Sequence, residues 1–177
     1  MDKLIQTLIS GLSLGSIYAL IALGYTMVYG IAKMLNFAHG DIIMVGAYAV
    51  ITAAFTMGLP PFIAILISIA LCALLGIVIE FLAYRPLRQA QPLAVLITAI
   101  GVSYLLQNLA LLIYGSEQKA FPTIVALPTV HIGGVYIDGI TLATLVVTAV
   151  IMVALSLFIN KTRMGKAMRA VSEDKEA

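Results

Sequence analysis

The sequence predicts an all-α polytopic transmembrane helical bundle. Hydrophobic residues make up 62% of the 177-residue chain and charged residues only 10%, whereas a soluble domain carries about 25% charged residues. Two long runs, Leu4–Ala32 and Ile42–Ile79, contain no charged side chain. The ten Lys and Arg residues stand at the ends of apolar runs and form no stripe that could follow phosphates. An ordinary soluble domain and a nucleic-acid-binding protein are therefore excluded.

About five membrane segments are expected, because one span needs roughly 20 apolar residues. The first run is longer than a span requires, so we expect that helix to bend or break near Gly24 or Gly30. It is also too long for the apolar core of a cleaved signal peptide. The second membrane segment is short. We therefore expect it to start before Asp41 and to be broken or re-entrant beside a protein-lined cavity. The segments are Leu4–Ala32, Ala38–Met57, Phe62–Ile79, Pro92–Tyr114 and Thr141–Ile159.

The basic residues predict which connections face the cytoplasm. Arg85 and Arg88 lie in one such connection, and the basic residues of 160–177 mark another. Residues 115–140 should then form an extracytoplasmic loop. Within it, Gly133-Gly134 joins two β-branched runs, which predicts a small β-hairpin. These charges leave two possible sides of the membrane for the N-terminus, because a re-entrant segment would change the number of membrane crossings.

The polar segment Asn36-Phe37-Ala38-His39-Gly40-Asp41 is the main candidate for function, because ionisable groups at membrane depth are expensive and usually functional. Two readings are compatible. Asn36 caps a helix whose positive N-terminus faces Asp41, or the segment lines or gates a solute path. His39 and Asp41 are too few for a zinc site, so we expect no metal and no cofactor.

A second motif, Gly11-Leu12-Ser13-Leu14-Gly15, matches the G-x-S-x-G pattern of hydrolases. That pattern needs a strand, a turn and a helix, whereas here it lies inside an expected membrane helix. Gly11 and Gly15 share one helical face, and small residues at this spacing favour close helix packing. We therefore interpret both glycines as packing residues, and an intramembrane hydrolase using Ser13 remains the alternative.

Ser103, Gln107 and Asn108 place polar side chains in the middle of the fourth segment. Such residues usually join helices by hydrogen bonds, so we expect them to be structural.

Near the C-terminus, Ser172 is a candidate N-cap, with Glu173 and Asp174 in the first turn of a helix that starts where the chain stops. A helix this short is unstable alone. The simplest expectation is that the chain is the N-terminal part of a longer protein.

Five segments of the sequence, in the same order, resemble the permeases of branched-chain amino acid ABC importers of the leucine/isoleucine/valine type. They are Gly15-Ser16-Ile17-Tyr18-Ala19-Leu20, Gly24-Tyr25-Thr26-Met27-Val28-Tyr29-Gly30, Asn36-Phe37-Ala38-His39-Gly40-Asp41, Tyr84-Arg85-Pro86-Leu87-Arg88 and Arg163-Met164-Gly165-Lys166-Ala167-Met168-Arg169-Ala170.

The resemblance implies a single transmembrane permease domain over 1–177, C-terminally truncated, in the bacterial plasma (inner) membrane. Its partners would be a second homologous permease, two cytoplasmic ATPase subunits and a periplasmic substrate-binding protein. ATP would be hydrolysed by the partners, so the chain would be no enzyme. Residues 160–177 resemble a cytoplasmic coupling segment, whose pattern here stops at Glu176-Ala177.

The residues expected to matter fall into two groups. Those expected along the solute path are Tyr25, Asn36, His39 and Asp41. Those expected to couple the chain to the ATPases are Gly165, Arg169, Glu173 and Glu176. The solute is expected to be a branched-chain amino acid, with urea or short amides as an alternative. A different class, an ion-coupled secondary transporter or channel using His39 and Asp41, is kept as the rival function.

Overall fold

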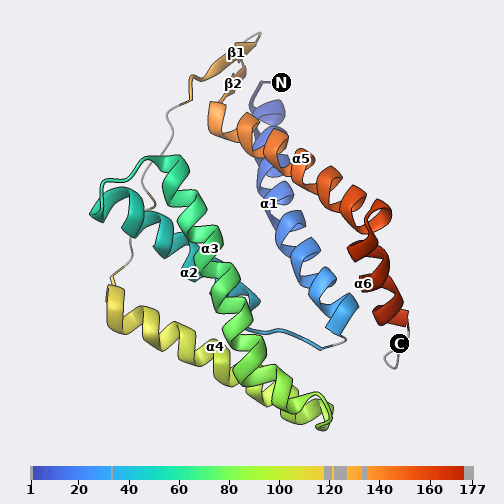
Figure 1. Ribbon diagram of the computed structural model, residues 1–177. Coiled ribbons are helices and arrows are strands. Elements are labelled where there is room, and N and C mark those ends of the chain that lie inside the picture. Colours follow the sequence, from blue (N-terminus) through green and yellow to red (C-terminus); the bar gives the residue numbers. More distant parts are fainter. Residues whose placement is uncertain (1, 33, 118–120, 122–126, 133–134, 174–177) are drawn as a thin grey trace. The chain divides into compact units, whose positions relative to one another are not determined.

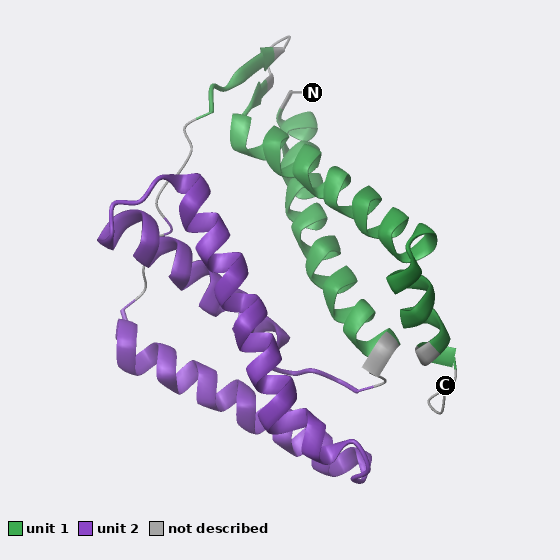
Figure 2. Ribbon diagram, viewed as in Figure 1, with its two compact units in different colours: residues 1–33, 126–177 green, residues 34–125 purple. Residues whose placement is uncertain are grey.

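The computed structural model describes the chain except for residues 1, 33, 118–120, 122–126, 133–134 and 174–177 (Figure 1). Five helical segments of the described chain are long and apolar enough to cross a membrane, as expected for a polytopic helical membrane protein. The chain divides into two compact units, residues 1–33 with 126–177 and residues 34–125 (Figure 2).

The first unit contains the two ends of the chain. Helix α1 (Asp2–Ala32) packs against α5 (Gly139–Lys161), and both contact the shorter α6 (Arg163–Glu173). Strands β1 (Val130–Ile132) and β2 (Val135–Ile137) pair antiparallel. The predicted β-hairpin strands are therefore confirmed, although the two glycines between them lie outside the described residues.

Helix α1 corrects one expectation. It is helical without interruption from Asp2 to Ala32, so the predicted break near Gly24 or Gly30 is wrong, and a bend there stays a prediction. The run contains no proline to remove a backbone donor. Glycine alone weakens a helix by only about 1 kcal/mol relative to alanine, which does not end a helix in an apolar stretch of this length.

Helix α6 corrects another expectation. The predicted helix start at Ser172 is wrong, because α6 already begins at Arg163 and Ser172 lies in its last turn. Thr162 is the cap instead: its backbone is extended (φ −89°, ψ 156°), and its Oγ1 accepts a hydrogen bond of 3.0 Å from the backbone N–H of Gly165. A threonine that bonds the N–H three residues later is a normal helix N-cap.

The second unit consists of α2 (His39–Ile51), α3 (Pro61–Ile79) and α4 (Pro92–Tyr114), with helical turns after α2 and α3. Helix α2 contacts both α3 and α4. It approaches α3 most closely at Gly46, where an added Cβ would lie 2.8 Å from Cys72 Sγ and 3.2 Å from Ser68 Oγ. Ser68 Oγ donates a 2.8 Å hydrogen bond to the Gly46 carbonyl. Small residues allow this approach between apolar helices.

The second span begins before Asp41, as predicted, but it is not broken. Helix α2 starts at His39 and passes directly into a π-helical turn, Thr52–Thr56. Together they form an 18-residue span. The irregularity takes the form of a widened turn, of the kind that often marks an insertion in a helix. A turn with Gly58 at φ 65° then leads to α3.

Candidate functional site

The carboxyl group of Asp41 is the centre of the candidate site. Asp41 lies in the first turn of α2, where an acidic side chain complements the helix dipole, and it is only 9% exposed. Both of its oxygens accept hydrogen bonds from α4. Ser103 Oγ donates to Oδ2 at 2.5 Å, and Gln107 Nε2 donates to Oδ1 at 3.0 Å. Residues 62 and 66 positions apart in sequence thus meet at one buried carboxyl group.

The same three side chains form a closed ring. Gln107 Nε2 also donates to Ser103 Oγ, at 3.2 Å. Carboxylate oxygens only accept hydrogen bonds, and the serine hydroxyl has one proton to give. Ser103 therefore gives its proton to Asp41 and receives one from Gln107. The prediction that Ser103 and Gln107 join helices by hydrogen bonds is confirmed. Asn108 differs, because its Nδ2 donates to the Tyr104 carbonyl of its own helix.

Asn36 holds the segment that precedes α2. Its Oδ1 accepts hydrogen bonds from the Tyr84 hydroxyl, at 2.9 Å, and from the backbone N–H of Ala38, at 3.1 Å. Ala38, rather than Asn36, occupies the N-cap position of α2. Asn36 therefore orders the turn before the helix and ties it to the π-helical turn Glu80–Tyr84 that follows α3.

A small apolar cluster lies beside these polar contacts. Ala38, Ile79 and Leu106 are buried there, with Ile42 and Val102 packed against them. The cluster brings together the start of α2, the end of α3 and the middle of α4. It shields the polar groups on one side, and hydrogen bonds are stronger where the surroundings are less polar.

Three of the four predicted path residues gather at the start of α2. Asn36 and Asp41 make the contacts above, and His39, half-buried, is the first residue of the helix. The fourth, Tyr25, lies on α1 and belongs to the other unit. Sequence reasoning missed the partnership of Asn36 with Tyr84, because nothing in a sequence pairs two residues 48 positions apart.

The other end of α2 is also tied to α4. The rings of Tyr48 and Tyr114 stack with centroids 4.1 Å apart, and the Tyr114 hydroxyl lies 3.0 Å from Thr52 Oγ1. Thr52 is the first residue of the π-helical turn. The two helices are thus joined by polar side chains near both ends of their contact.

The predicted coupling residues lie on or beyond α6. Gly165 is buried where α6 crosses the end of α5: an added Cβ would lie 2.3 Å from the Ile159 carbonyl oxygen and 2.5 Å from that of Phe158. Only glycine fits this approach. Arg169 donates a hydrogen bond to Asn160 Oδ1. Glu173 is the last residue of α6, and Glu176 lies outside the described residues.

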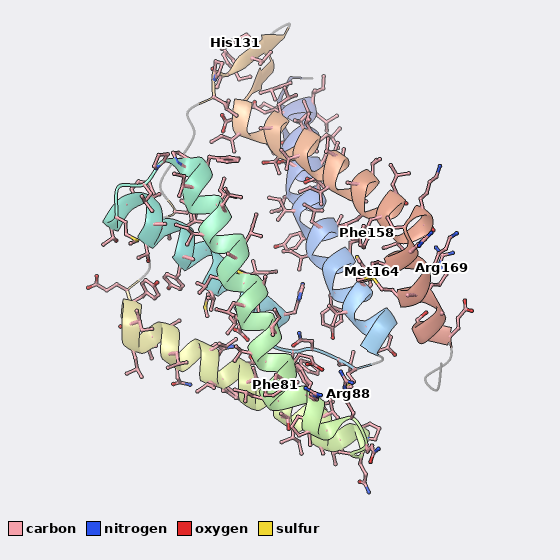
Figure 3. The ribbon with its side chains drawn as sticks, in the orientation of Figure 1. Phe81, Arg88, His131, Phe158, Met164 and Arg169 are labelled. Carbon is pink, nitrogen blue, oxygen red and sulfur yellow. The ribbon has the colours of Figure 1, made fainter. Side chains whose placement is uncertain are left out.

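A cavity of about 160 Å³ lies between α1, α5 and α6. Figure 3 shows Phe158, Met164 and Arg169 around the corner where α5 passes into α6. The cavity is largely apolar, and its lining residues are Met27, Gly30, Ile159, Met168, Arg169 and Ser172. Helix α6 contacts both of the other helices that line the cavity.

Gly11 and Gly15 meet no other part of the described chain. An added Cβ at either position would have no described heavy atom within 4 Å, so their packing role stays a prediction. Ser13 lies between them in the uninterrupted helix α1. The strand–turn–helix geometry of a hydrolase nucleophile is therefore absent at Ser13.

Comparison with known proteins agrees with this membrane architecture. Residues 7–177 match the family described as "Branched-chain amino acid transport system / permease component". The chain is 44% identical to the high-affinity branched-chain amino acid transport system permease protein BraD of Pseudomonas aeruginosa. It is 40% identical to the permease protein LivH of Escherichia coli and 39% identical to that of Salmonella typhimurium.

Each of these three matches covers 96% of this chain and 59% of the relative. The chain therefore spans less than two thirds of the length of these relatives. No solved structure matches the chain significantly. Its relatives, together with the five apolar helices found among the described residues, identify it as a multi-pass protein of the plasma (inner) membrane.

Proposed function

Because the chain belongs to the family of branched-chain amino acid transport permeases, we propose that it forms half of the membrane path of an ATP-driven importer for branched-chain amino acids. The observation that carries this proposal is the family match over nearly the whole chain, residues 7–177. The five apolar helices and the buried polar site at the start of α2 support it.

In this proposal the path runs past the start of α2. Asn36, His39 and Asp41 place polar groups there in a chain that is otherwise strongly apolar. Tyr25, on α1, stays a predicted path residue. A small zwitterionic solute needs such groups, because charged solutes cannot be stabilised by hydrocarbon. The chain itself performs no bond chemistry, and partner subunits hydrolyse the ATP.

Coupling is assigned to α6 and the residues that follow it. Gly165 and Thr162 fix the corner between α5 and α6, and Arg169, Glu173 and Glu176 offer charged contacts to a cytoplasmic ATPase. Closure of two ATPase subunits would move this corner and switch the path between outward-facing and inward-facing arrangements. A second homologous permease would complete the path, and a periplasmic binding protein would deliver the solute.

The test is uptake by cells in which the gene for this chain is deleted and then restored. We expect deletion to abolish high-affinity uptake of labelled leucine, isoleucine and valine, and restoration to recover it. Depleting ATP should stop uptake, whereas collapsing the proton gradient at constant ATP should not.

Two other results would replace the proposal. Uptake that follows the proton gradient and persists without ATPase partners would favour an ion-coupled transporter that uses His39 and Asp41. Unchanged amino acid uptake together with lost uptake of urea or short amides would keep the mechanism and change the solute.

A further inference from the structure

We propose that Gln107 contacts the solute, and that Asp41 and Ser103 act as positioning residues that hold its side-chain carbonyl in place. This inference rests on the proposed function and names one residue of the same path. It follows from the closed ring of hydrogen bonds among the three side chains.

The hydrogen bonds of the ring allow only one orientation of the Gln107 side-chain amide. Asp41 Oδ1, which can only accept, lies 3.0 Å from Gln107 Nε2. Ser103 Oγ lies 3.2 Å from the same nitrogen. A side-chain amide has two N–H groups, so both are used within the ring. The carbonyl oxygen Oε1 takes no part in the ring and makes no hydrogen bond to any residue that the structure describes.

The position of that oxygen is unusual for a membrane helix. Gln107 is exposed and lies seven residues before Tyr114, the last residue of α4, which places it about 10 Å inside the helix end. A carbonyl group facing hydrocarbon without a hydrogen bond costs about 2–7 kcal/mol. Water, a solute or a neighbouring polar group must therefore face it.

Of these three, the proposed solute has the chemistry that suits a fixed carbonyl oxygen. A fixed carbonyl oxygen accepts hydrogen bonds and gives none. A branched-chain amino acid carries its hydrogen-bond donors on one ammonium group, because its side chain is aliphatic. Hydrogen bonds from a charged donor are the stronger kind. The arrangement thus suits an ammonium group that passes along α4.

Asp41 acts on the solute through Gln107 in this arrangement. Each of its oxygens accepts one hydrogen bond from an α4 donor, and its side chain is buried. Its negative charge still favours a passing ammonium group, but its direct role is to keep the amide from turning over.

The first test is Gln107→Met, which keeps the length of the side chain and removes the amide. Leucine uptake is measured in cells that carry the complete transport system, normalised to the amount of the chain in the membrane. We expect uptake per transporter to fall roughly tenfold, the typical value of a hydrogen bond to a charged group. Asn108→Leu is the matched control, because the Asn108 side chain donates to a carbonyl group of its own helix and to no other helix among the described residues. Its uptake should stay within about twofold of wild type.

The second test needs no change to Gln107 itself. Cys72 is the only cysteine, so cysteines can be placed one at a time in a Cys72→Ala background that still transports leucine. Leu111 lies one turn from Gln107 on the same face of α4, and Leu109 lies on the opposite face. A water-soluble thiol reagent should label Leu111→Cys, leucine should slow that labelling, and Leu109→Cys should stay unlabelled, because thiolates form only where water reaches.

The outcomes separate the two proposals. If wild type transports leucine but Gln107→Met does as well, or Leu111→Cys is not protected by leucine, the assignment of Gln107 is overturned and the proposed function stands. If Gln107→Met lowers the amount of the chain in the membrane but leaves uptake per transporter normal, the assignment also fails, because the side chain then matters only through its hydrogen bonds to Asp41 and Ser103. Absence of leucine uptake by wild type would overturn the proposed function itself.

Discussion

The two compact units are held together in different ways. In residues 34–125, polar side chains cross from helix to helix: Asp41 bonds α4, Asn36 bonds Tyr84 and Ser68 bonds α2. In the other unit, Ser16 of α1 and Thr144 of α5 donate instead to carbonyl groups of their own helices.

Burial follows the same division. No residue in the most apolar part of α1 is buried, whereas 22% of the second span is. In a bilayer, lipid tails are as apolar as leucine, so apolar surface alone does not drive helices together. The unit built around α2 therefore carries its own specificity in polar and small residues, and the long apolar faces of α1 and α5 do not. The predictions below test this difference, from the largest expected effect to the smallest.

The corner between α5 and α6 should be the most sensitive point. We expect Gly165→Ala to destabilise the protein by about 3 kcal/mol, because its Cβ would collide with the carbonyl oxygens of Phe158 and Ile159. Unfolding in mixed micelles measures the loss, and trypsin should cleave more rapidly at Lys166 as α6 is displaced. Gly11→Ala is the control: nothing described lies within 4 Å of its Cβ, and it should be neutral or slightly stabilising. Equal losses for both variants would contradict the close approach at Gly165.

Removing one hydroxyl should distinguish the two units directly. Ser103→Ala deletes a hydrogen bond to the buried Asp41 carboxyl, and bonds of this kind contribute about 1.5–3 kcal/mol. We expect a loss of about 2 kcal/mol in the free energy of unfolding. Ser16→Ala removes a hydroxyl that, within the described residues, bonds the Ser13 carbonyl of its own helix, so its loss should be below about 0.5 kcal/mol. A similar loss at both positions would mean that the polar contacts of α2 with α4 are not what distinguishes the second unit.

The far end of the α2–α4 contact should show a smaller effect. Tyr114→Phe keeps the stacked ring beside Tyr48 but removes the hydroxyl that lies 3.0 Å from Thr52. We expect a loss of about 1 kcal/mol, the usual contribution of a neutral hydrogen bond. Tyr104→Phe, at a side chain that is 62% exposed, is the control and should change stability by less than half as much. The same micelle unfolding measures both, and a loss at Tyr104 as large as that at Tyr114 would refute the contribution of this bond.

The smallest effect is expected at the exposed ion pair after α3. Arg88 lies 2.6 Å from Glu80, with both side chains about half or more exposed, and Figure 3 shows Arg88 and Phe81 in this region. Exposed pairs contribute about 0–1 kcal/mol and are screened by salt. Arg88→Gln should therefore cost less than about 1 kcal/mol, and the difference from wild type should shrink in high salt. A larger loss that does not depend on salt would show that Arg88 has another, buried partner.

The sequence was most informative where a pattern is local. Long uncharged runs predicted the membrane helices, and Gly133-Gly134 between β-branched residues predicted the hairpin strands. Local patterns misled at two places. The excess length of the first run suggested a break that does not occur, and Ser172 suggested a helix start although Thr162 is the cap. In both cases a local cause decides where the helix runs: α1 has no proline to end it, and the Thr162 side chain caps α6, which therefore begins at Arg163 and not at Ser172.

The sequence identified the residues of the candidate site but not the contact between them. Asp41 stood out because a carboxyl group in an apolar chain is rare, and Ser103 with Gln107 stood out as a polar stripe on an apolar helix. That these two features are one site depended on the contact between α2 and α4.

The sequence by itself determined the class of this protein, because the cost of placing charges in hydrocarbon restricts them to segment ends and to a few functional positions. It also indicated which residues are candidates for a functional role. Only the tertiary structure decided what those residues do. Hydrogen bonds join Asp41 to partners more than 60 residues away, and their directions follow from which atoms donate and which accept. The close approach at Gly165 likewise exists only because α6 folds back over the end of α5.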